Sequence, residues 1–329
     1  MNLRDIAKLA NVSISTVSKA FNNADDISKE TRERIFKIAK ENGCYGKYHR
    51  DRYDKKVIAV ICPEITSSYY CNIIELIQKS VNDRGGEVII STDGFDQNRR
   101  LELVEYHASF SGADGIIVFP LKYNLPKHFN VPIVSIGNSA DRNIDSIIIN
   151  TDSAMNDAIA CLKANGHHNI ALITEKLTSS RKKQFEEAMI NNRLEPKPEY
   201  IFTSNRRFED AGKQGIEELF KTGHDFSAVV CSYDYIALGA INKLDEMGLR
   251  VPEDVSVVSM LDNSLPKVTK QGISSIKDCS EELCELACEL IYKKFKNNFY
   301  HTNKHIELIA TFIDRGTIGP NKRKDNGVV

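Results

Sequence analysis

The sequence predicts an α/β protein in which a small helix-turn-helix head of three helices precedes two doubly wound parallel-sheet lobes. The chain has 329 residues, enough for two or three domains. From residue 57 onward, short apolar runs alternate with amphipathic helical stretches. That alternation is typical of parallel strands covered on both faces by helices. Residues 1–45 instead carry three short helical patterns and no strand pattern.

The helices of the head can be placed from their capping residues. Asn2 can cap the first helix, Ser13 can cap a second that begins at Ile14, and Ser28 can cap a third. Gly43 is suited to end the third helix. Only a tight turn separates the first two helices. This spacing predicts a helix-turn-helix, whose second helix enters the DNA major groove by its N-terminal residues.

The charge distribution also points to nucleic acid at the head. The whole chain has 44 Lys and Arg against 45 Asp and Glu, but residues 1–56 hold 13 basic and 8 acidic residues. A charged, solvated face is the alternative interpretation of this asymmetry. The start of the second helix favours DNA, because a helix packed on another domain would carry apolar residues there. Its side chains are mostly short, polar or basic and leave room for base edges: Ile14, Ser15, Thr16, Ser18 and Lys19.

The elements of the body follow in two series. The first has apolar strands at 56–62, 87–91, 115–119, 132–136 and 146–150, with helices at 70–84 and 98–111. The second has helices at 151–165, 180–193, 209–222 and 234–247, with strands at 170–174, 200–203, 228–231 and 255–259. Two series imply two lobes, whose ligands bind beyond the carboxyl ends of the strands. The sequence has neither a GxGxxG nor a Walker A motif, so no nucleotide cofactor is expected.

The head sequence closely resembles the LacI/GalR family of transcription regulators, through LRDIAKLANVSISTVSKAFNN followed by ISKETRERIFKIAKENGCY. The resemblance implies that Ile14 and Ser15 are the main base readers. Lys19 stands where the family usually has Arg. Lys offers a point charge in place of the bidentate guanidinium of Arg, so weaker selectivity for guanine is expected at this position. The resemblance also implies phosphate contacts from a further set of residues: Asn2, Ser13, Thr16, Ser18, Asn22, Ser28 and Thr31.

Residues 46–56 depart from the family pattern. Family members usually have an A-R-x-L-like motif here, which folds as a hinge helix on DNA and inserts a Leu into the minor groove. This chain reads GKYHRDRYDKK, which is shorter and contains no Leu. Tyr48 or Tyr53 could act as the wedge. The alternative is a plain basic linker.

The resemblance continues through ADGIIVFP, NGHHNIALI, VVCSYDYIALGA, DEMGLRVPEDVSVVSMLDN and LIATFIDRGT. It implies a periplasmic-binding-protein-like pair of lobes, with the chain crossing between them near Asn150, residues 275–278 and Ile309. The expected organisation is a DNA-binding head at 1–45, a linker at 46–56, a ligand-binding and dimerisation domain at 57–320 and a disordered tail at 321–329. Within that domain, the N-lobe takes 57–149 and 279–308, and the C-lobe takes 150–278 and 309–320.

Effector-binding residues are expected where strands end at the cleft between the lobes. By resemblance, Tyr69 and Tyr70 match an aromatic pair that packs on a sugar or base, Arg181 matches a ligand-binding Arg, and Asp262 matches an Asp that binds ligand polar groups. The other expected effector-binding residues are Asp93, Asn138, Arg207 and Asp234.

Some of these residues have simpler interpretations. Asp234 could merely cap its helix, and Asp93 could merely cap a turn. The arginines Arg181, Arg206 and Arg207 suggest an anionic group on the ligand, although Arg206 and Arg207 could equally point to solvent. 

Nothing in the sequence predicts catalysis or a metal site. No Ser or Cys lies in a nucleophile-elbow motif, and the eight cysteines include no CxxC pair. Cys284 with Cys288, and His301 with His305, are spaced one helical turn apart but lack the loop spacing of a zinc site. No apolar run approaches the about 18 residues of a membrane span. The N-terminus has no apolar signal region, so we expect a cytoplasmic, nucleoid-associated protein with no cofactor.

The sequence therefore predicts a homodimeric, ligand-responsive transcription repressor. Its partners would be a pseudo-palindromic double-stranded operator and a small effector, a sugar or sugar derivative, in the cleft. Two alternatives remain open. One is a cytoplasmic solute-binding sensor whose altered linker has weakened operator binding. The other is a regulator controlled by a protein partner.

Overall fold

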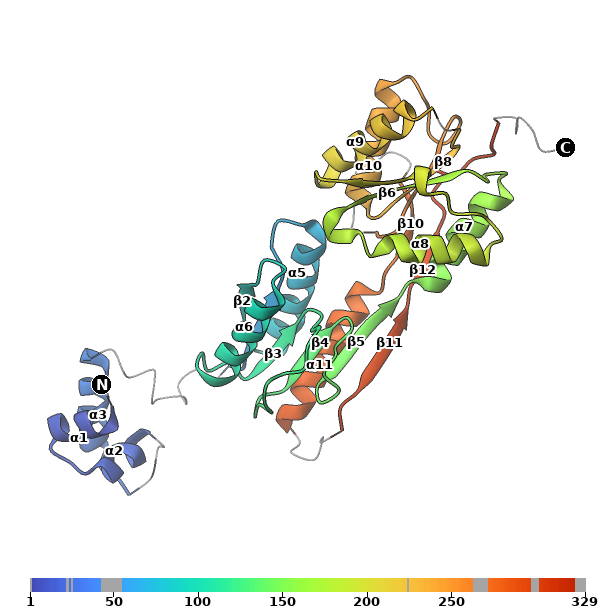
Figure 1. The fold of residues 1–329 in the computed structure, drawn as a ribbon. Coiled ribbons are helices and arrows are strands. Elements are labelled where there is room, and N and C mark those ends of the chain that lie inside the picture. Colours follow the sequence, from blue (N-terminus) through green and yellow to red (C-terminus); the bar gives the residue numbers. More distant parts are fainter. Residues whose placement is uncertain are drawn as a thin grey trace.

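The computed structural model describes residues 2–21, 24, 26–42, 55–223, 225–262, 272–296 and 302–322. These residues form a three-helix head and two lobes, each built on a six-stranded sheet (Figure 1). The α/β fold class predicted from the sequence is confirmed.

The head is held by capped helices around a small apolar core. It consists of α1 (Leu3–Ala10), α2 (Ile14–Phe21) and α3 (Lys29–Glu41). The Asp5 N–H donates to Asn2 Oδ1 at 3.0 Å, and the Asn2 N–H donates to the Asp5 carboxylate at 2.9 Å. This reciprocal capping box satisfies two backbone donors at the start of α1. The buried side chains between the helices are Ile6, Ala7, Ala10, Val17, Ala20, Phe21, Ile35 and Ala39.

The N-lobe sheet is parallel, with strand order β11-β5-β4-β3-β1-β2. Alternate side chains of β1 pack toward opposite faces. Ile58 and Val60 pack against helices α5 and α11, whereas Ala59 and Ile61 pack against helix α6. The elements are β1 (Val57–Cys62), α5 (Ser68–Asp83), β2 (Glu87–Thr92), α6 (Gln97–Ser109), β3 (Gly115–Val118), β4 (Ile133–Ile136), β5 (Asp145–Asn150), α11 (Ser280–Lys296) and β11 (His305–Ile309).

The C-lobe sheet has strand order β12-β10-β9-β8-β6-β7, in which β12 runs antiparallel to β10 and the other pairs are parallel. Helices α7 and α8 cover one face, and α9 and α10 cover the other. The elements are α7 (Asp152–Ala164), β6 (Ile170–Glu175), α8 (Arg181–Asn191), β7 (Ile201–Ser204), α9 (Phe208–Lys221), β8 (Ala228–Cys231), α10 (Asp234–Glu246), β9 (Ser256–Ser259), β10 (Ser274–Lys277) and β12 (Thr311–Ile313).

Helices α9 and α10 approach closely enough to require glycine. A Cβ added at Gly239 would lie 2.0 Å from the Glu209 carbonyl oxygen, and one at Gly212 would lie 2.0 Å from the Ile236 carbonyl oxygen. Because both neighbours are backbone atoms, the contact leaves no space for a side chain at either position.

The described chain passes from one sheet to the other after β5, after β10 and at Ala310, between β11 and β12. Strand β11 lies beside β5 (Figure 1), and the Ala310 N–H donates to the Asn150 carbonyl at 2.9 Å. Short connections at the ends of strands are the kind of hinge that lets two lobes rotate as rigid bodies.

The end of the described chain is packed on the C-lobe. The Asn321 side chain donates to the Gly166 carbonyl at 3.0 Å. The tail predicted from the sequence begins at Asn321, and the described chain extends through residue 322. Residues 323–329 of that expected tail lie outside the described residues.

His167 gives the C-lobe a pH-dependent stability. Its imidazole is buried and contacts Ser227 Oγ at 2.8 Å and the Gly319 carbonyl at 2.9 Å. Burial lowers the pKa of His167. The unfolded chain therefore takes up a proton near its ordinary pKa of about 6.5, while the folded chain resists protonation. The stabilisation from the neutral ring is present above that pH and is lost as the pH falls through the lowered native value.

We therefore expect urea denaturation between about pH 7 and pH 5 to show a smaller loss of stability in a His167→Gln variant than in the unaltered protein. His128→Gln, at an exposed position of the N-lobe, is the matched control and should keep the original pH dependence. Equal pH dependence in the two variants would contradict this assignment.

Candidate functional site

One face of α2 is turned away from the head core. Val17 and Ala20 are buried, whereas Ile14 is 43% exposed and Ser15 and Lys19 are also exposed. Thr16 and Ser18, which were predicted to contact phosphate, are half-buried. The predicted base readers Ile14, Ser15 and Lys19 are thus accessible at the surface of the head.

Lys19 already has a partner within the head. Its ammonium forms an ion pair with Asp26, and both side chains are about half exposed. A hydrogen bond from Lys19 lowers the pKa of Asp26. Exposed pairs of this kind are weak, so Lys19 can exchange Asp26 for a DNA acceptor.

Several of the predicted phosphate contacts cap helices. The Ser13 and Ser28 hydroxyls accept the Thr16 and Thr31 N–H groups at 3.0 and 3.2 Å. Asn2 caps α1. Capping places these side chains at helix N-termini, where backbone N–H groups favour phosphate. Asn22, and the linker tyrosines Tyr48 and Tyr53, lie outside the described residues.

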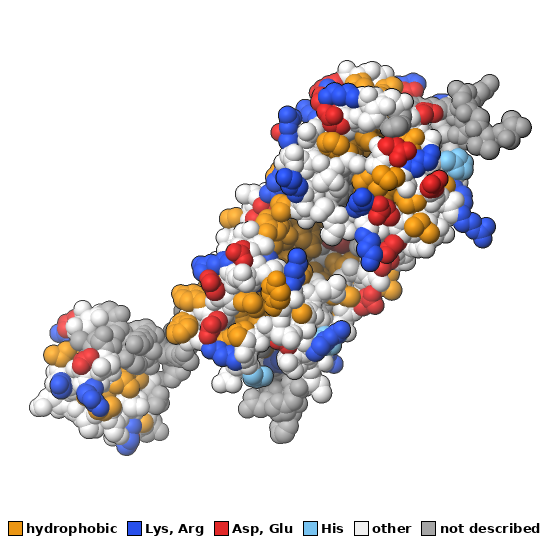
Figure 2. All heavy atoms as spheres, viewed as in Figure 1, with side chains coloured by type: hydrophobic (Ala, Val, Ile, Leu, Met, Phe, Trp, Pro, Cys, Tyr) orange, Lys and Arg blue, Asp and Glu red, His pale blue; other side chains and the backbone are white. Residues whose placement is uncertain are grey.

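An open cavity lies between the two lobes. Figure 2 shows the surface hollowed between the lobes, with hydrophobic side chains in the hollow. The lining follows the carboxyl ends of β1, β2, β6, β7, β8 and β9, where doubly wound sheets bind ligands. The N-lobe contributes Glu64, Ser67, Ser68, Tyr69, Tyr70 and Phe95. The C-lobe contributes Glu175, Leu177, Thr178, Arg181, Arg207, Phe208, Tyr233, Tyr235 and Leu261.

Aromatic rings form much of the cavity wall. On the N-lobe side, Tyr70 packs edge-to-face on Tyr69 and Phe95, with ring centroids 5.1 and 6.2 Å apart. On the C-lobe side, Phe208 packs on Tyr233 and Tyr235 at 6.3 and 6.0 Å. Burial raises the pKa of Tyr70 to about 12, so its hydroxyl stays protonated at neutral pH. The walls thus offer flat apolar faces with polar edges, which suits a small ring-shaped ligand.

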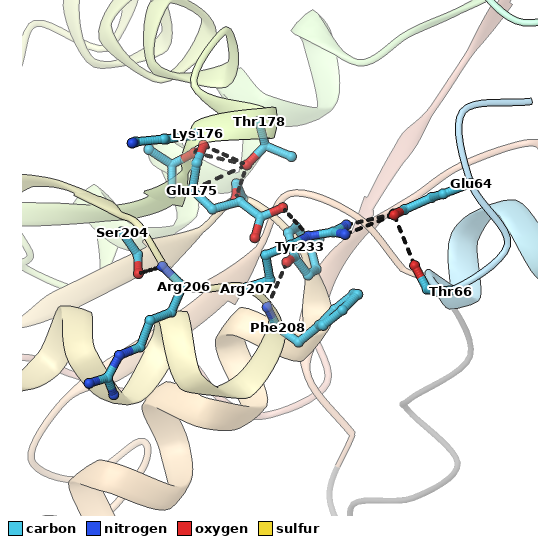
Figure 3. Close-up of polar contacts among 12 residues, drawn as sticks. Glu64, Thr66, Glu175, Lys176, Thr178, Ser204, Arg206, Arg207, Phe208 and Tyr233 are labelled. Carbon is cyan, nitrogen blue, oxygen red and sulfur yellow. Dashed lines mark hydrogen bonds and ion pairs between the residues drawn. The ribbon is translucent and has the colours of Figure 1, made fainter. Parts of the chain in front are cut away.

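A charged cluster bridges the two lobes. Arg207, which precedes α9, binds the Glu64 carboxylate with both terminal nitrogens, at 2.8 and 2.6 Å. Its Nε lies 3.6 Å from Glu175 Oε1, and its guanidinium lies 4.6 Å from the Phe208 ring centroid. Hydrogen bonding to Arg207 lowers the pKa of Glu64. Figure 3 shows Arg207 lying between the two carboxylates, so one side chain connects the lobes.

The structure places four of the eight expected effector-binding residues at the cavity: Tyr69, Tyr70, Arg181 and Arg207. Arg181 is half-buried, and its Nη1 donates to the Met260 carbonyl at 3.0 Å.

The other four expected residues are not among the described residues that line the cavity. Asp93 is buried and binds Arg100 through both oxygens, at 2.5 and 2.9 Å. Asp262 forms an ion pair with Arg315. Asp234 accepts the Tyr235 N–H at 3.0 Å at the start of α10, and Asn138 is exposed in the loop after β4.

The two acids of the cluster, Glu64 and Glu175, were not predicted from the sequence. Glu175 is the last residue of the buried strand IALITE in β6. An ionisable residue that ends an otherwise apolar parallel strand is a signal that could have found it, because such strand ends meet at the cleft.

Within the described parts of the chain, no group of three or more His, Cys, Asp or Glu side chains is placed to hold a metal ion. Among the described helices, none is both long and apolar enough to span a membrane.

Comparison with known proteins agrees with both parts of the structure. The family described as bacterial regulatory proteins, lacI family, matches residues 2–45, and a periplasmic binding protein-like domain matches residues 159–318. The probable HTH-type transcriptional repressor ExuR of Bacillus subtilis is 26% identical over 305 residues, covering 88% of this chain and 90% of the relative. The HTH-type transcriptional repressor CytR of Escherichia coli is 28% identical over 269 residues, covering 78% of each chain.

The fold is shared with solved repressors. The structure of the lac repressor dimer bound to operator and the anti-inducer ONPF superposes with a TM-score of 0.70 at 21% identity, over 96% of this chain and 98% of that chain. This chain therefore combines a DNA-binding domain of the lacI family of bacterial regulatory proteins, at residues 2–45, with a periplasmic binding protein-like domain, at residues 159–318.

Proposed function

We propose that the protein is a ligand-responsive transcription repressor that binds a pseudo-palindromic operator as a homodimer. The observation that carries the proposal is the combination in one chain of an exposed α2 face on the head and a two-lobed body with a cavity at its strand ends. Residues 1–45 act as the DNA-binding unit and residues 57–320 as the effector-binding and dimerisation unit, in the cytoplasm.

Coupling between the units follows from the two-lobe geometry. An effector that binds both walls of the cleft changes the relative orientation of the lobes, because its contacts differ between open and closed arrangements. In a dimer, that rotation alters the spacing of the two heads. Half-sites lie about one helical turn apart, so a change of spacing changes operator affinity.

The exposed edge of the N-lobe supports self-association. Strand β2 ends the sheet, and its Ile89 and Ile90 are 40% and 45% exposed. Phe110, after α6, is 75% exposed. An edge strand with exposed apolar side chains is a site that proteins usually cover, and a second copy of the chain would cover it here.

A sugar or sugar derivative is the effector class that fits the cleft. Tyr69, Tyr70 and Phe208 supply ring faces for the apolar face of a pyranose, while Arg181 and the two glutamates supply hydrogen-bonding groups for its hydroxyls.

The proposal is tested by selecting bound duplexes from a random DNA pool with full-length protein at fixed, moderate salt. We expect the pool to converge on one pseudo-palindrome, because two identical heads read two half-sites. A pool that converges on a single unrepeated site, or does not converge with or without sugars present, would contradict the proposal.

A further inference from the structure

Glu175 is a buried acid with one carboxylate oxygen that receives no hydrogen bond from the described residues. Its side chain is 3% exposed, yet it lines the cavity. Its Oε2 forms no hydrogen bond with any described residue. Burial raises the pKa of the Glu175 carboxyl, and the neighbouring Tyr233 hydroxyl and Arg207 guanidinium oppose that shift. A buried carboxylate oxygen without a donor is costly, so a donor from a ligand would relieve that cost.

Arg207 pairs with Glu175 only loosely, through Oε1, and leaves Oε2 without a donor. Both of its terminal nitrogens bind Glu64, and its Nε is 3.6 Å from Glu175, beyond a normal hydrogen bond. Within the described chain, that Nε is itself buried without a hydrogen-bond partner. The guanidinium is also held against the Phe208 ring. Arg207 therefore binds mainly Glu64 and leaves Glu175 Oε2 available to a ligand.

The charges of the cavity do not favour an anionic ligand. The charged lining residues are Glu64, Glu175, Arg181 and Arg207, and the pair between Glu64 and Arg207 is internally neutral. The third arginine considered from the sequence, Arg206, does not belong to the described lining, and its side chain points away from the cluster in Figure 3. Of three arginines that suggested an anion, only Arg181 is left in the cavity without an acidic hydrogen-bond partner among the described residues.

We infer that Glu175 is the specificity-determining residue of the cleft, where it accepts a hydrogen bond from a hydroxyl or ammonium group of a pyranose-sized effector. The site then binds a neutral sugar or an amino sugar. It discriminates against a sugar acid of the same size, because the carboxylate of that sugar would be repelled by the buried carboxylate of Glu175. This inference rests on the proposed function, because it assigns the class of effector for the same cleft.

The test uses three pyranoses of similar size and different charge: D-glucosamine, D-glucose and D-glucuronate. Thermal unfolding of the full-length protein is followed over a concentration series of each, because a ligand that binds the folded state raises the Tm with concentration. We expect glucose or glucosamine to bind at least about tenfold more tightly than glucuronate, as judged by these concentration series. The order of affinities for the three sugars in the unaltered protein tests whether the cleft selects ligands by charge.

A Glu175→Gln variant then assigns the selectivity to this residue. It keeps the shape and one acceptor but removes the charge, so the preference over glucuronate should shrink by about tenfold. Glu187→Gln on α8, whose side chain is 58% exposed, removes one acidic charge away from the cavity and should leave the ranking unchanged. Tighter binding of glucuronate, no binding of any of the three sugars, or an unchanged ranking in Glu175→Gln overturns the inference.

Operator binding by the same preparations separates the two proposals. If the protein selects a palindrome while the sugar results fail, the role of Glu175 is wrong and the proposed function stands. If no operator is selected, the proposed function itself fails.

Discussion

A Ser15→Glu variant is expected to lose operator affinity by at least about 100-fold, which corresponds to about 2.7 kcal/mol. Ser15 is exposed on α2, so the new carboxylate would face the phosphates and base edges of the groove. The substitution lies in the first turn of the helix, where a negative charge is favourable for the helix itself. Loss of binding would therefore report on the DNA contact and not on unfolding.

Lys37→Gln is the charge-matched control for this variant. It also lowers the charge of the head by one, but at an exposed position of α3. We expect it to weaken binding only a few-fold and similarly for all duplexes, as loss of general electrostatic attraction does. Fluorescence anisotropy with the selected duplex at one salt concentration measures both variants. Equal losses in the two would show that α2 is not the reading helix.

An Arg100→Met variant is expected to destabilise the N-lobe by about 3–5 kcal/mol. Arg100 and Asp93 are paired with side-chain exposures of 3% and 0%, and Arg100 also donates to the Pro120 carbonyl at 2.6 Å. Removing the guanidinium leaves a buried carboxylate without its counter-charge. The same turn carries Phe95, whose N–H donates to Asp93 at 2.9 Å, so the cavity wall would be disturbed as well.

The pairing is tested by urea denaturation of three variants. Arg99→Met, at an adjacent residue whose side chain is 55% exposed, should cost less than about 1 kcal/mol. The double variant Asp93→Asn with Arg100→Met should be more stable than Arg100→Met, because it contains no unpaired buried charge. If the double variant is no more stable than the single variant, the destabilisation has another cause.

Elements with a strong local pattern could be predicted from the sequence. The run VIAVIC forms β1, and the predicted strand at 170–174 is β6, extended by Glu175. The cap at Asn2 and the turn before Ile14 depend on neighbouring residues, so local sequence was sufficient there.

Elements that depend on distant pairing were missed. The sequence pattern assigned no strand or helix between 274 and 313, where β10, α11, β11 and β12 lie. Strand β12 has three residues and pairs with β10, although α11 and β11 lie between the two strands in the sequence. A strand that short has no periodicity of its own, and only the sheet defines it.

Dependence on residues distant in sequence also explains why two expected effector-binding acids were misplaced. Asp93 and Asp262 lie near strand ends, as ligand-binding acids do, but the fold supplies each with an arginine. Arg315 is distant in sequence from Asp262, so the pair cannot be recognised without the fold. Arg181 and the tyrosine pair come from the resemblance to a known family. The position of Glu175 at a strand end is visible in the sequence, but its burial and its unpartnered oxygen are visible only in the fold.

We propose that two heads of one dimer read two half-sites on one face of the duplex. The direct test titrates full-length protein onto the selected palindrome and onto a duplex with about 5 bp, half a helical turn, inserted between the half-sites. We expect two chains per palindrome and a loss of affinity of at least about 100-fold on insertion, because the second half-site then faces away. Equal affinity for the two duplexes, or one chain per palindrome, would contradict it.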